Sequence, residues 1–250
     1  MTEKRKLPRW AFRCCLLLLL FLIRGRIIAE AASRPEEMPT IPTPAPTALL
    51  PVGQEEKNAE FPWPLTQVDR EHPAVPPSET RRLEGVPVDV RVYEPLSRML
   101  RNAREAGFDV CLRSGVRSGS TQSYLYRRAE EIYGVDNAPF HEAPGGFSEH
   151  EAGLAYDITD GGFDGEAEAF ADTELFRWLQ EHGWEYGFIL RYPPDNKYTT
   201  GFCFQPCHYR YVGAEAAREI TERGWILEEY WHSRRVPGGE SEKYNFSKVF

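Results

Sequence analysis

The sequence predicts an α+β domain in which helices flank a mostly antiparallel central sheet. Segments with helical periodicity and short segments with strand-like alternation follow one another in mixed order. The regular alternation of strand and helix that is typical of a parallel sheet is missing. Hydrophobic residues make up 41% of the 250 residues and aromatic residues 13%, which is enough for a packed core. No internal repeat is found in the sequence.

Four segments have the pattern of amphipathic helices, and each is followed directly by a glycine that can end it. In the first segment, Leu96, Met99, Leu100 and Ala103 share one face. Asp172 is predicted to cap the third. The predicted helices span residues 94–106, 121–133, 173–182 and 214–223.

Three short segments are predicted to be strands, at residues 108–113, 154–158 and 209–212. Gly153 allows the chain to bend into the second of them. Because side chains alternate along a strand, Ala155 and Asp157 share the face opposite to that of Leu154 and Tyr156.

The N-terminal segment 1–31 is predicted to be a signal peptide or a membrane anchor. Basic residues precede an apolar block at residues 14–23, as in a signal peptide. Small residues are spaced for cleavage before Ala32, but Arg24 and Arg26 oppose export and leave an uncleaved anchor as the alternative. In both cases the rest of the chain is expected outside the cytoplasm, secreted or anchored at the cell envelope.

Three further parts follow the N-terminal segment. Residues 32–64 are rich in proline and are predicted to form a linker, residues 65–235 a folded domain, and residues 236–250 a tail. The net charge of −8 and the isoelectric point of about 5.4 argue against a nucleic-acid partner. Any membrane contact is expected only through the N-terminal segment.

Two histidines and one aspartate have the character of a metal site. His150 precedes the strand that carries Asp157, and His208 begins another strand. Two imidazole nitrogens and one carboxylate oxygen suit a catalytic Zn²⁺ whose fourth position stays open. A His–Asp pair alone is more often a hydrogen bond than a ligand pair, so the spacing needs support from the rest of the chain.

That support comes from several motifs in a fixed order. They are V-D-V-R-V-Y-E-P-L from Val88, R-S-G-V-R-S-G-S-T-Q from Arg113, S-E-H-E-A-G-L-A-Y-D-I from Ser148, W-L-Q-E-H-G-W-E-Y-G-F-I-L-R-Y-P from Trp178, and Q-P-C-H-Y-R-Y-V-G from Gln205. Together they resemble the VanY-type D-alanyl-D-alanine carboxypeptidases, a zinc peptidase family with the hedgehog/DD-peptidase-like fold. The resemblance covers roughly residues 65–231.

The resemblance implies a role for each matching residue. His150, Asp157 and His208 would be the zinc ligands. Arg117 would face the scissile carbonyl oxygen, with a loop-bracing salt bridge as the alternative. Two further residues match positions that hold the substrate: Gln122, for which a hydrogen bond at the helix start is equally open, and Ser148. His141 and His182 match no motif and are expected to be surface or core histidines.

The chain departs from the family pattern at three positions. Where the family has E-P-W-H with a general-base glutamate, this chain has Gln205 and Cys207, and Val116 replaces a tyrosine. An amide cannot carry the proton of an attacking water, and general acid–base catalysis typically contributes about 10² to 10⁴-fold. Glu151 and Asp160 are possible substitute bases, although neither matches the base position of the family.

The three cysteines outside the N-terminal segment are an odd number. They are Cys111, Cys203 and Cys207. Cys207 is expected to point away from the metal toward the core, as a small hydrophobic residue first, a disulfide partner second and a soft zinc ligand third.

Two functions therefore remain open. The first is a zinc D,D-carboxypeptidase of the cell envelope that acts on peptidoglycan stem peptides ending in D-Ala-D-Ala, either weakly because of Gln205 or through another base. The second is a non-catalytic, zinc-containing protein that binds peptidoglycan or a partner. A third reading is that the zinc itself is lost and only the fold remains.

Overall fold

A computed structural model of the chain describes residues 61–162 and 167–235. The predicted signal or anchor segment, residues 32–60 of the predicted linker and the predicted tail lie outside the described residues. None of the helices within the described ranges combines the length and the apolar character needed to cross a membrane.

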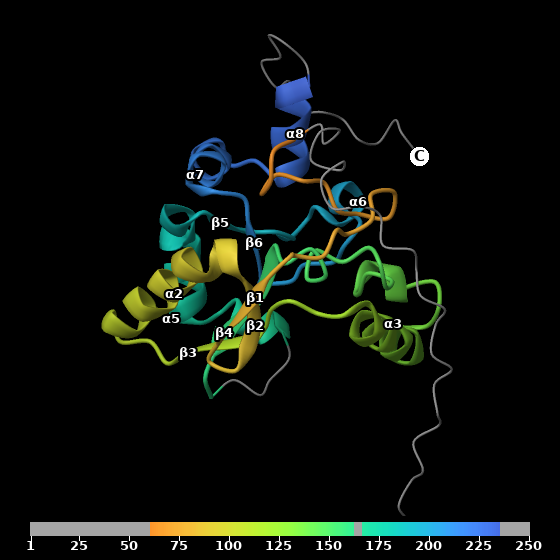
Figure 1. The fold of residues 1–250 in the computed structure, drawn as a ribbon, viewed down its shortest axis with the longest axis horizontal. Coiled ribbons are helices and arrows are strands. Elements are labelled where there is room, and N and C mark those ends of the chain that lie inside the picture. The colour runs from red at the N-terminus through yellow and green to blue at the C-terminus, as the bar shows by residue number, and fades with distance from the viewer. Residues whose placement is uncertain (1–60, 163–166, 236–250) are drawn as a thin grey trace, which may run out of the picture. The chain divides into compact units, whose positions relative to one another are not determined.

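The domain is built around a four-stranded sheet with the order β3-β4-β6-β5, in which every neighbouring pair is antiparallel (Figure 1). A two-stranded antiparallel hairpin forms a second sheet. The prediction of an α+β fold with a mostly antiparallel sheet is confirmed. The strands are β1 (Thr80–Leu83), β2 (Val86–Asp89), β3 (Val110–Ser114), β4 (Ala155–Asp160), β5 (Phe188–Leu190) and β6 (His208–Tyr211).

All four predicted helices are present. The longer helices are α2 (Val90–Glu105), α3 (Gly119–Tyr133), α5 (Glu174–His182), α7 (Ala214–Arg223) and α8 (Leu227–Arg235), of which α8 was not predicted. Single turns occur at α4 (Ala167–Phe170) and α6 (Lys197–Thr200), and as 3₁₀ turns at η1 (Ala138–Phe140) and η2 (Gly183–Tyr186).

Two helix starts differ from the prediction because of their caps. The α2 helix begins four residues early, since the Asp89 carboxylate accepts a hydrogen bond from the backbone N–H of Arg91 at 2.8 Å. Pro95 therefore lies inside the helix rather than in its first turn. The α5 helix is capped by the Thr173 hydroxyl, which accepts from the backbone N–H of Phe176, and not by Asp172.

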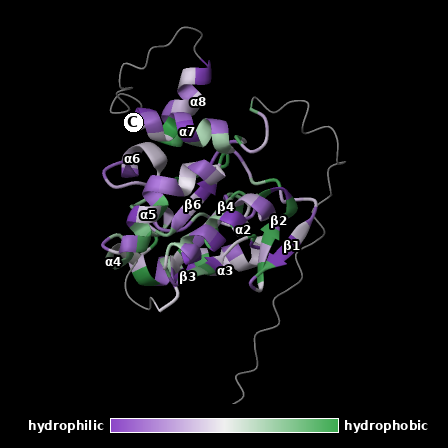
Figure 2. Ribbon diagram, turned by 90° about the vertical axis from the view of Figure 1, so that its left-hand side faces the viewer, coloured by the Kyte–Doolittle hydropathy of each residue, from purple (hydrophilic) through white to green (hydrophobic). Residues whose placement is uncertain are grey.

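The main core lies between the sheet and helices α2 and α5, which stand on the opposite side of the strands from α3 in Figure 1. Leu96 and Met99 of α2 and Leu179 of α5 are buried there with Tyr156 and Ile158 of β4. Hydrophobic colours dominate β2 and hydrophilic ones β1 (Figure 2), in agreement with the exposure of β1.

A second core joins α7 and α8 to the edge of the sheet. Ile189, Val212, Ile220 and Trp231 are buried in this cluster together with Phe61, which falls in the predicted linker. The Trp231 indole N–H donates to the backbone oxygen of Leu65 at 2.9 Å. Residues 61–66 therefore pack against the domain.

Candidate metal centre and active site

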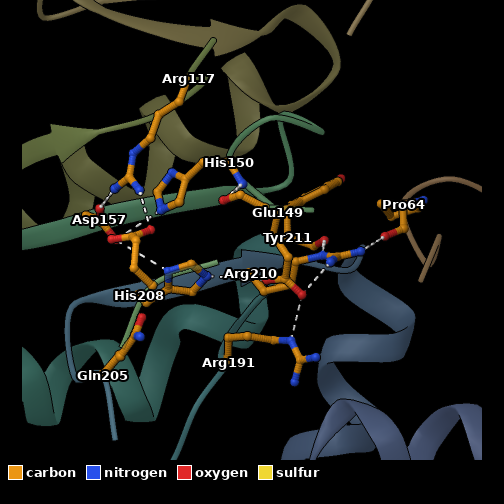
Figure 3. Close-up of polar contacts among 12 residues, drawn as sticks. Pro64, Arg117, Glu149, His150, Asp157, Arg191, Gln205, His208, Arg210 and Tyr211 are labelled. Carbon is orange, nitrogen blue, oxygen red and sulfur yellow. Dashed lines mark hydrogen bonds and ion pairs between the residues drawn. The ribbon is translucent and has the colours of Figure 1, made fainter. Parts of the chain in front are cut away.

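The register of the central sheet places two of the predicted metal ligands side by side. Asp157 of β4 is paired directly with His208 of β6, and His150 lies in the turn before β4. Their donor atoms all lie within 4.8 Å of one another. Figure 3 shows the three side chains converging.

A hydrogen bond at one ring nitrogen of His150 leaves the other ring nitrogen able to bind a metal. Nδ1 of the buried His150 ring lies 2.9 Å from the backbone oxygen of Gly115, so Nδ1 carries the proton and donates it. Nε2 is buried and forms no hydrogen bond within the described residues. It lies 3.4 Å from Oδ1 of Asp157, with its lone pair free to bind an ion.

His208 is oriented in the same way by Glu149. Nε2 of His208 lies 3.3 Å from the Glu149 carboxylate, and Nδ1 lies 3.5 Å from Oδ1 of Asp157. A carboxylate that accepts from one ring nitrogen leaves the other as a ligand, an arrangement common around protein-bound zinc. Glu149 was not singled out from the sequence, although it stands between Ser148 and His150 in the S-E-H motif.

Glu149 is in turn held by two buried arginines (Figure 3). Arg191 donates to it from Nε at 2.7 Å, and Nη1 of Arg210 lies at 2.8 Å in an ion pair. Arg191 also pairs with Glu228 of α8 at 2.6 Å, and Arg210 donates to the backbone oxygen of Pro64. Two arginines and two glutamates thus balance in charge beneath the donor set.

These contacts determine the protonation of the site. Burial alone would raise the pKa of Glu149, but Arg191 and Arg210 hold it below the usual range. Burial lowers the pKa of His150. Burial also opposes protonation of His208, but hydrogen bonds to Asp157 and Glu149 outweigh it and raise the pKa.

The donor set fits a zinc ion. In a tetrahedral site with ligand bonds of about 2.0–2.2 Å, neighbouring donor atoms stand about 3.4 Å apart. Oδ1 of Asp157 lies 3.4 Å from Nε2 of His150 and 3.5 Å from Nδ1 of His208. Three protein ligands would leave one position facing a cavity of about 650 Å³ that His150, Asp157 and His208 line.

Arg117 stands beside the donor set and is tightly held. Its Nη2 donates to Oδ2 of Asp157 at 2.6 Å, and its Nε donates to the Ser114 hydroxyl at 2.9 Å. The same guanidinium contacts Glu142 through Nη1 at 3.3 Å. These ion pairs fit the bracing role, and Arg117 also lines the cavity, whereas its role at the scissile carbonyl oxygen stays a prediction.

The two predicted substrate-binding residues lie in different places. Ser148 is buried, lines the cavity and accepts a hydrogen bond from the backbone N–H of His150 at 3.3 Å. Gln122 is fully buried behind the cavity wall. Its amide donates to Glu142 at 2.6 Å and to the backbone oxygen of Ala143 at 2.8 Å, which favours a bracing role.

Gln205 lines the cavity, next to the donor set in Figure 3. Its side-chain N–H donates to the backbone oxygen of His141 at 3.0 Å. A carboxylate at this position could not make that bond, because it has no proton to donate when ionised. The amide is therefore matched to its surroundings.

His141, predicted to be a surface or core histidine, is half-buried and belongs to the cavity wall. Its ring stacks on Tyr133 with 3.7 Å between centroids. No motif marked it, because its position results from the packing of η1 against α3. The His182 side chain is 39% exposed and pairs with Glu185, as expected for a surface histidine.

Within the described residues, Cys111, Cys203 and Cys207 form no disulfide. Cys207 packs at the edge of the main core and also lines the cavity, so its side chain is not turned wholly away from the site as predicted. Burial raises its pKa to about 12. Its sulfur does not belong to the group of donor atoms that His150, Asp157 and His208 form, so the role as a small hydrophobic residue fits best.

Neither of the substitute bases considered from the sequence reaches the cavity. The Glu151 carboxylate accepts from the backbone N–H groups of Gly146 and Ser148 and holds that loop. Asp160 stands three residues beyond Asp157 on β4, about 10 Å along the strand, and accepts from the backbone N–H of Gly162.

The structure combines an α+β fold with two histidines and one aspartate that line an open cavity. Such a donor set is typical of the active site of a metal-dependent hydrolase. Residues 86–214 match the family model "VanY: D-alanyl-D-alanine carboxypeptidase". A D-alanyl-D-alanine carboxypeptidase of Enterococcus faecalis is 30% identical over 248 residues, covering 90% of each chain. The chain belongs to the VanY D-alanyl-D-alanine carboxypeptidase family.

Two solved structures of this family are similar to the chain. VanYB in complex with D-alanine-D-alanine is 34% identical with a TM-score of 0.61, covering 68% of this chain and 98% of its own. A variant of the D,D-pentapeptidase VanY from a VanB-type vancomycin resistance cassette, in complex with Zn(II), is also 34% identical. Its TM-score is 0.60, and the coverage is 68% and 99%. Zinc, expected from the sequence, is confirmed for a member of the family.

Proposed function

We propose that this protein is a zinc-dependent D,D-carboxypeptidase of the cell envelope that removes the terminal D-alanine from peptidoglycan stem peptides ending in D-Ala-D-Ala. The observation that carries the proposal is the donor set. His150, Asp157 and His208 lie together at the cavity, and the buried Nε2 of His150 forms no hydrogen bond within the described residues. Membership of the VanY family supplies the substrate class.

The residues of the cavity divide the chemistry among them. Zinc, when bound by the three donors, supplies a Lewis acid that polarises the scissile carbonyl and lowers the pKa of water to about 7. Arg117 presents a fixed positive charge beside Asp157, where it can stabilise negative charge that develops on the carbonyl oxygen. Ser148 faces the same cavity and can orient the peptide.

Weak turnover is part of the proposal because of Gln205. Its amide can accept a hydrogen bond from water through its oxygen, but it cannot take the proton away. Without any replacement, the loss of a general base corresponds to about 3 to 5 kcal/mol of barrier lowering.

The same residue supports a second candidate, a non-catalytic protein that keeps the zinc and binds peptidoglycan or a partner. Location outside the cytoplasm, secreted or held by the N-terminal segment, is part of both proposals and derives from the basic and apolar pattern of residues 1–31.

The two candidates are separated by measuring D-alanine release from a synthetic stem pentapeptide by the full-length protein. Zinc content is measured on the same sample. Zinc with clear release supports the carboxypeptidase, whereas zinc and peptide binding without release support the non-catalytic protein. A preparation that is free of zinc after zinc addition and yet natively stable would contradict both.

A further inference from the structure

One carboxylate in the cavity has no assigned task. Three acidic side chains of the described residues line it, namely Glu142, Glu149 and Asp157. Glu149 is held by Arg191 and Arg210 and faces His208. Asp157 belongs to the donor set. Glu142 is therefore the acidic group of this cavity that remains available to a reacting molecule.

Glu142 is fixed on one oxygen and open on the other. Its Oε1 accepts from the Gln122 amide at 2.6 Å and from Nη1 of Arg117 at 3.3 Å. Among the described residues, no hydrogen bond or ion pair reaches Oε2. The side chain is 26% exposed, so water can approach it without the group being on the open surface.

Arg117 places Glu142 close to the donor set. Its guanidinium binds Glu142 through Nη1 and Asp157 through Nη2 at 2.6 Å. Because the guanidinium is a rigid planar fork, the two carboxylates stand side by side across its width. Glu142 is thus held next to the place where a water and a scissile carbonyl would meet.

Glu142 is also adjacent to the position where the family has its base. The Gln205 amide donates to the backbone oxygen of His141, the residue directly before Glu142. This contact fixes the Gln205 nitrogen and leaves its oxygen as an acceptor for a water proton. The amide oxygen of one residue and the carboxylate of the other can then act on the same water.

We propose that Glu142 is the catalytic residue that moves the proton in this protein, in place of the carboxylate missing at Gln205. The water oxygen forms a bond to the carbonyl carbon while one water proton passes to Glu142. Glu142 then gives that proton to the nitrogen of the terminal D-alanine as the C–N bond breaks, which releases a free carboxyl group and an amine. This inference rests on the proposed carboxypeptidase function.

The test is the Glu142→Gln variant of the full-length protein. The amide of the new side chain can still accept from Arg117 and Gln122, so the cavity wall is kept while proton transfer is removed. We expect kcat for D-alanine release from the stem pentapeptide to fall about 10² to 10⁴-fold. Zinc content and the calorimetric Kd for the same peptide, measured with zinc present, should not change.

Two further variants complete the experiment. Glu174→Gln is the matched control, because Glu174 is an exposed carboxylate on α5 that pairs only with Arg177 among the described residues. It should release D-alanine at the wild-type rate. Adding Gln205→Glu to the Glu142→Gln variant should restore most of the release, since it returns a carboxylate to the other side of the same water.

Each contrary result has its own meaning. Release by Glu142→Gln within about threefold of wild type would overturn the role of Glu142 and leave the carboxypeptidase function standing. A loss of zinc that matches the loss of rate would assign Glu142 a structural role and would also overturn the inference. No release from zinc-loaded wild-type protein would overturn both the inference and the carboxypeptidase function.

Discussion

Asp157 and His208 are direct partners in the antiparallel ladder between β4 and β6. Directly opposed residues on one face of such a pair have Cβ atoms about 4.5–5.5 Å apart, and the donor atoms of these two lie 3.5 Å apart. The backbone hydrogen bonds of the sheet therefore position two of the three donors. A slip of one residue would turn one partner to the opposite face of the sheet and destroy the site.

Replacing a donor should abolish zinc binding. In His208→Ala, one of three ligands is lost, so we expect the zinc content measured by atomic emission to fall from about one ion per chain to near zero. His182→Ala, which changes an exposed histidine, serves as the control and should keep its zinc. A His208→Ala protein with full zinc content would contradict the assignment of the donor set.

Glu149→Gln should weaken both the fold and the metal site. Removing this charge leaves Arg191 and Arg210 with only Glu228 as a balancing acid in the cluster, and breaking a buried ion pair typically costs about 3–5 kcal/mol. Loss of a carboxylate that orients a ligand histidine typically costs about 10 to 100-fold in metal affinity. Urea unfolding and zinc competition with a chelator measure the two effects, with Glu185→Gln as the surface control.

The Glu149 contribution should also depend on pH in a defined direction. The pKa of Glu149 is lower in the folded protein than its ordinary value of 4.5. Its stabilisation is therefore present above that value and is lost as the pH falls toward the depressed pKa. In the zinc-free protein, the difference in unfolding free energy between wild type and Glu149→Gln should shrink as the pH falls below about 5. A constant difference would contradict the assigned ionisation.

Gly115→Ala should disturb the anchor of His150. A Cβ atom at Gly115 would stand 2.3 Å from the backbone oxygen of Pro87, so the backbone would have to move. The carbonyl of Gly115 would move with it, and that carbonyl holds Nδ1 of His150. We expect a loss of about 1–3 kcal/mol in unfolding free energy together with weaker zinc binding. Gly162→Ala, where a Cβ finds space, is the control.

Cys207→Ala should keep the metal. The thiol is neutral and packs at the core edge, so its removal should lower the unfolding free energy by about 1 kcal/mol and leave the zinc content unchanged. Cys111→Ala, which removes a thiol from β3, is the control and should also leave the zinc content unchanged. A lower zinc content in Cys207→Ala alone would instead support the alternative role of Cys207 as a soft ligand.

Gln205→Glu should raise the release of D-alanine above that of the wild type. The variant gains a carboxylate at the base position of the family, although it loses the hydrogen bond to the backbone oxygen of His141. If Glu142 already moves the proton, the gain in wild type should be smaller than the gain in Glu142→Gln. The comparison needs kcat at one pH for wild type, Gln205→Glu, Glu142→Gln and the double variant. If Gln205→Glu raises kcat by the same factor in wild type and in Glu142→Gln, residues 142 and 205 do not share the proton transfer.

The main helices and the central strands could be predicted because their side-chain periodicity is local. Helix α7 has the predicted ends, since its amphipathic pattern runs without interruption to Gly224. The β1–β2 hairpin escaped prediction because β1 is exposed and β2 contains Pro87. Strand β5 is only three residues long, which is too short for an alternating pattern to show.

The donor residues could be chosen from the sequence because a motif marks them, but their supporting residues could not. Glu149, Arg191 and Glu228 meet only after three distant segments have packed together. Glu142 likewise becomes notable only when Arg117 and Gln122 are seen to hold it. Residue type alone does not distinguish such buried charges from the many solvated ones on the surface.

The ion pair between Arg191 and Glu228 also shows how far along the chain the residues that support the site extend. The match to the family model ends at residue 214, whereas Glu228 lies in α8 beyond it. Truncation, frameshift or proteolysis between these points would spare every donor atom and still remove one of the two acids that balance Arg191 and Arg210. The part of the chain that supports the site is therefore longer than the segment that matches the family, because its last helix supplies a charge to a site that it does not line.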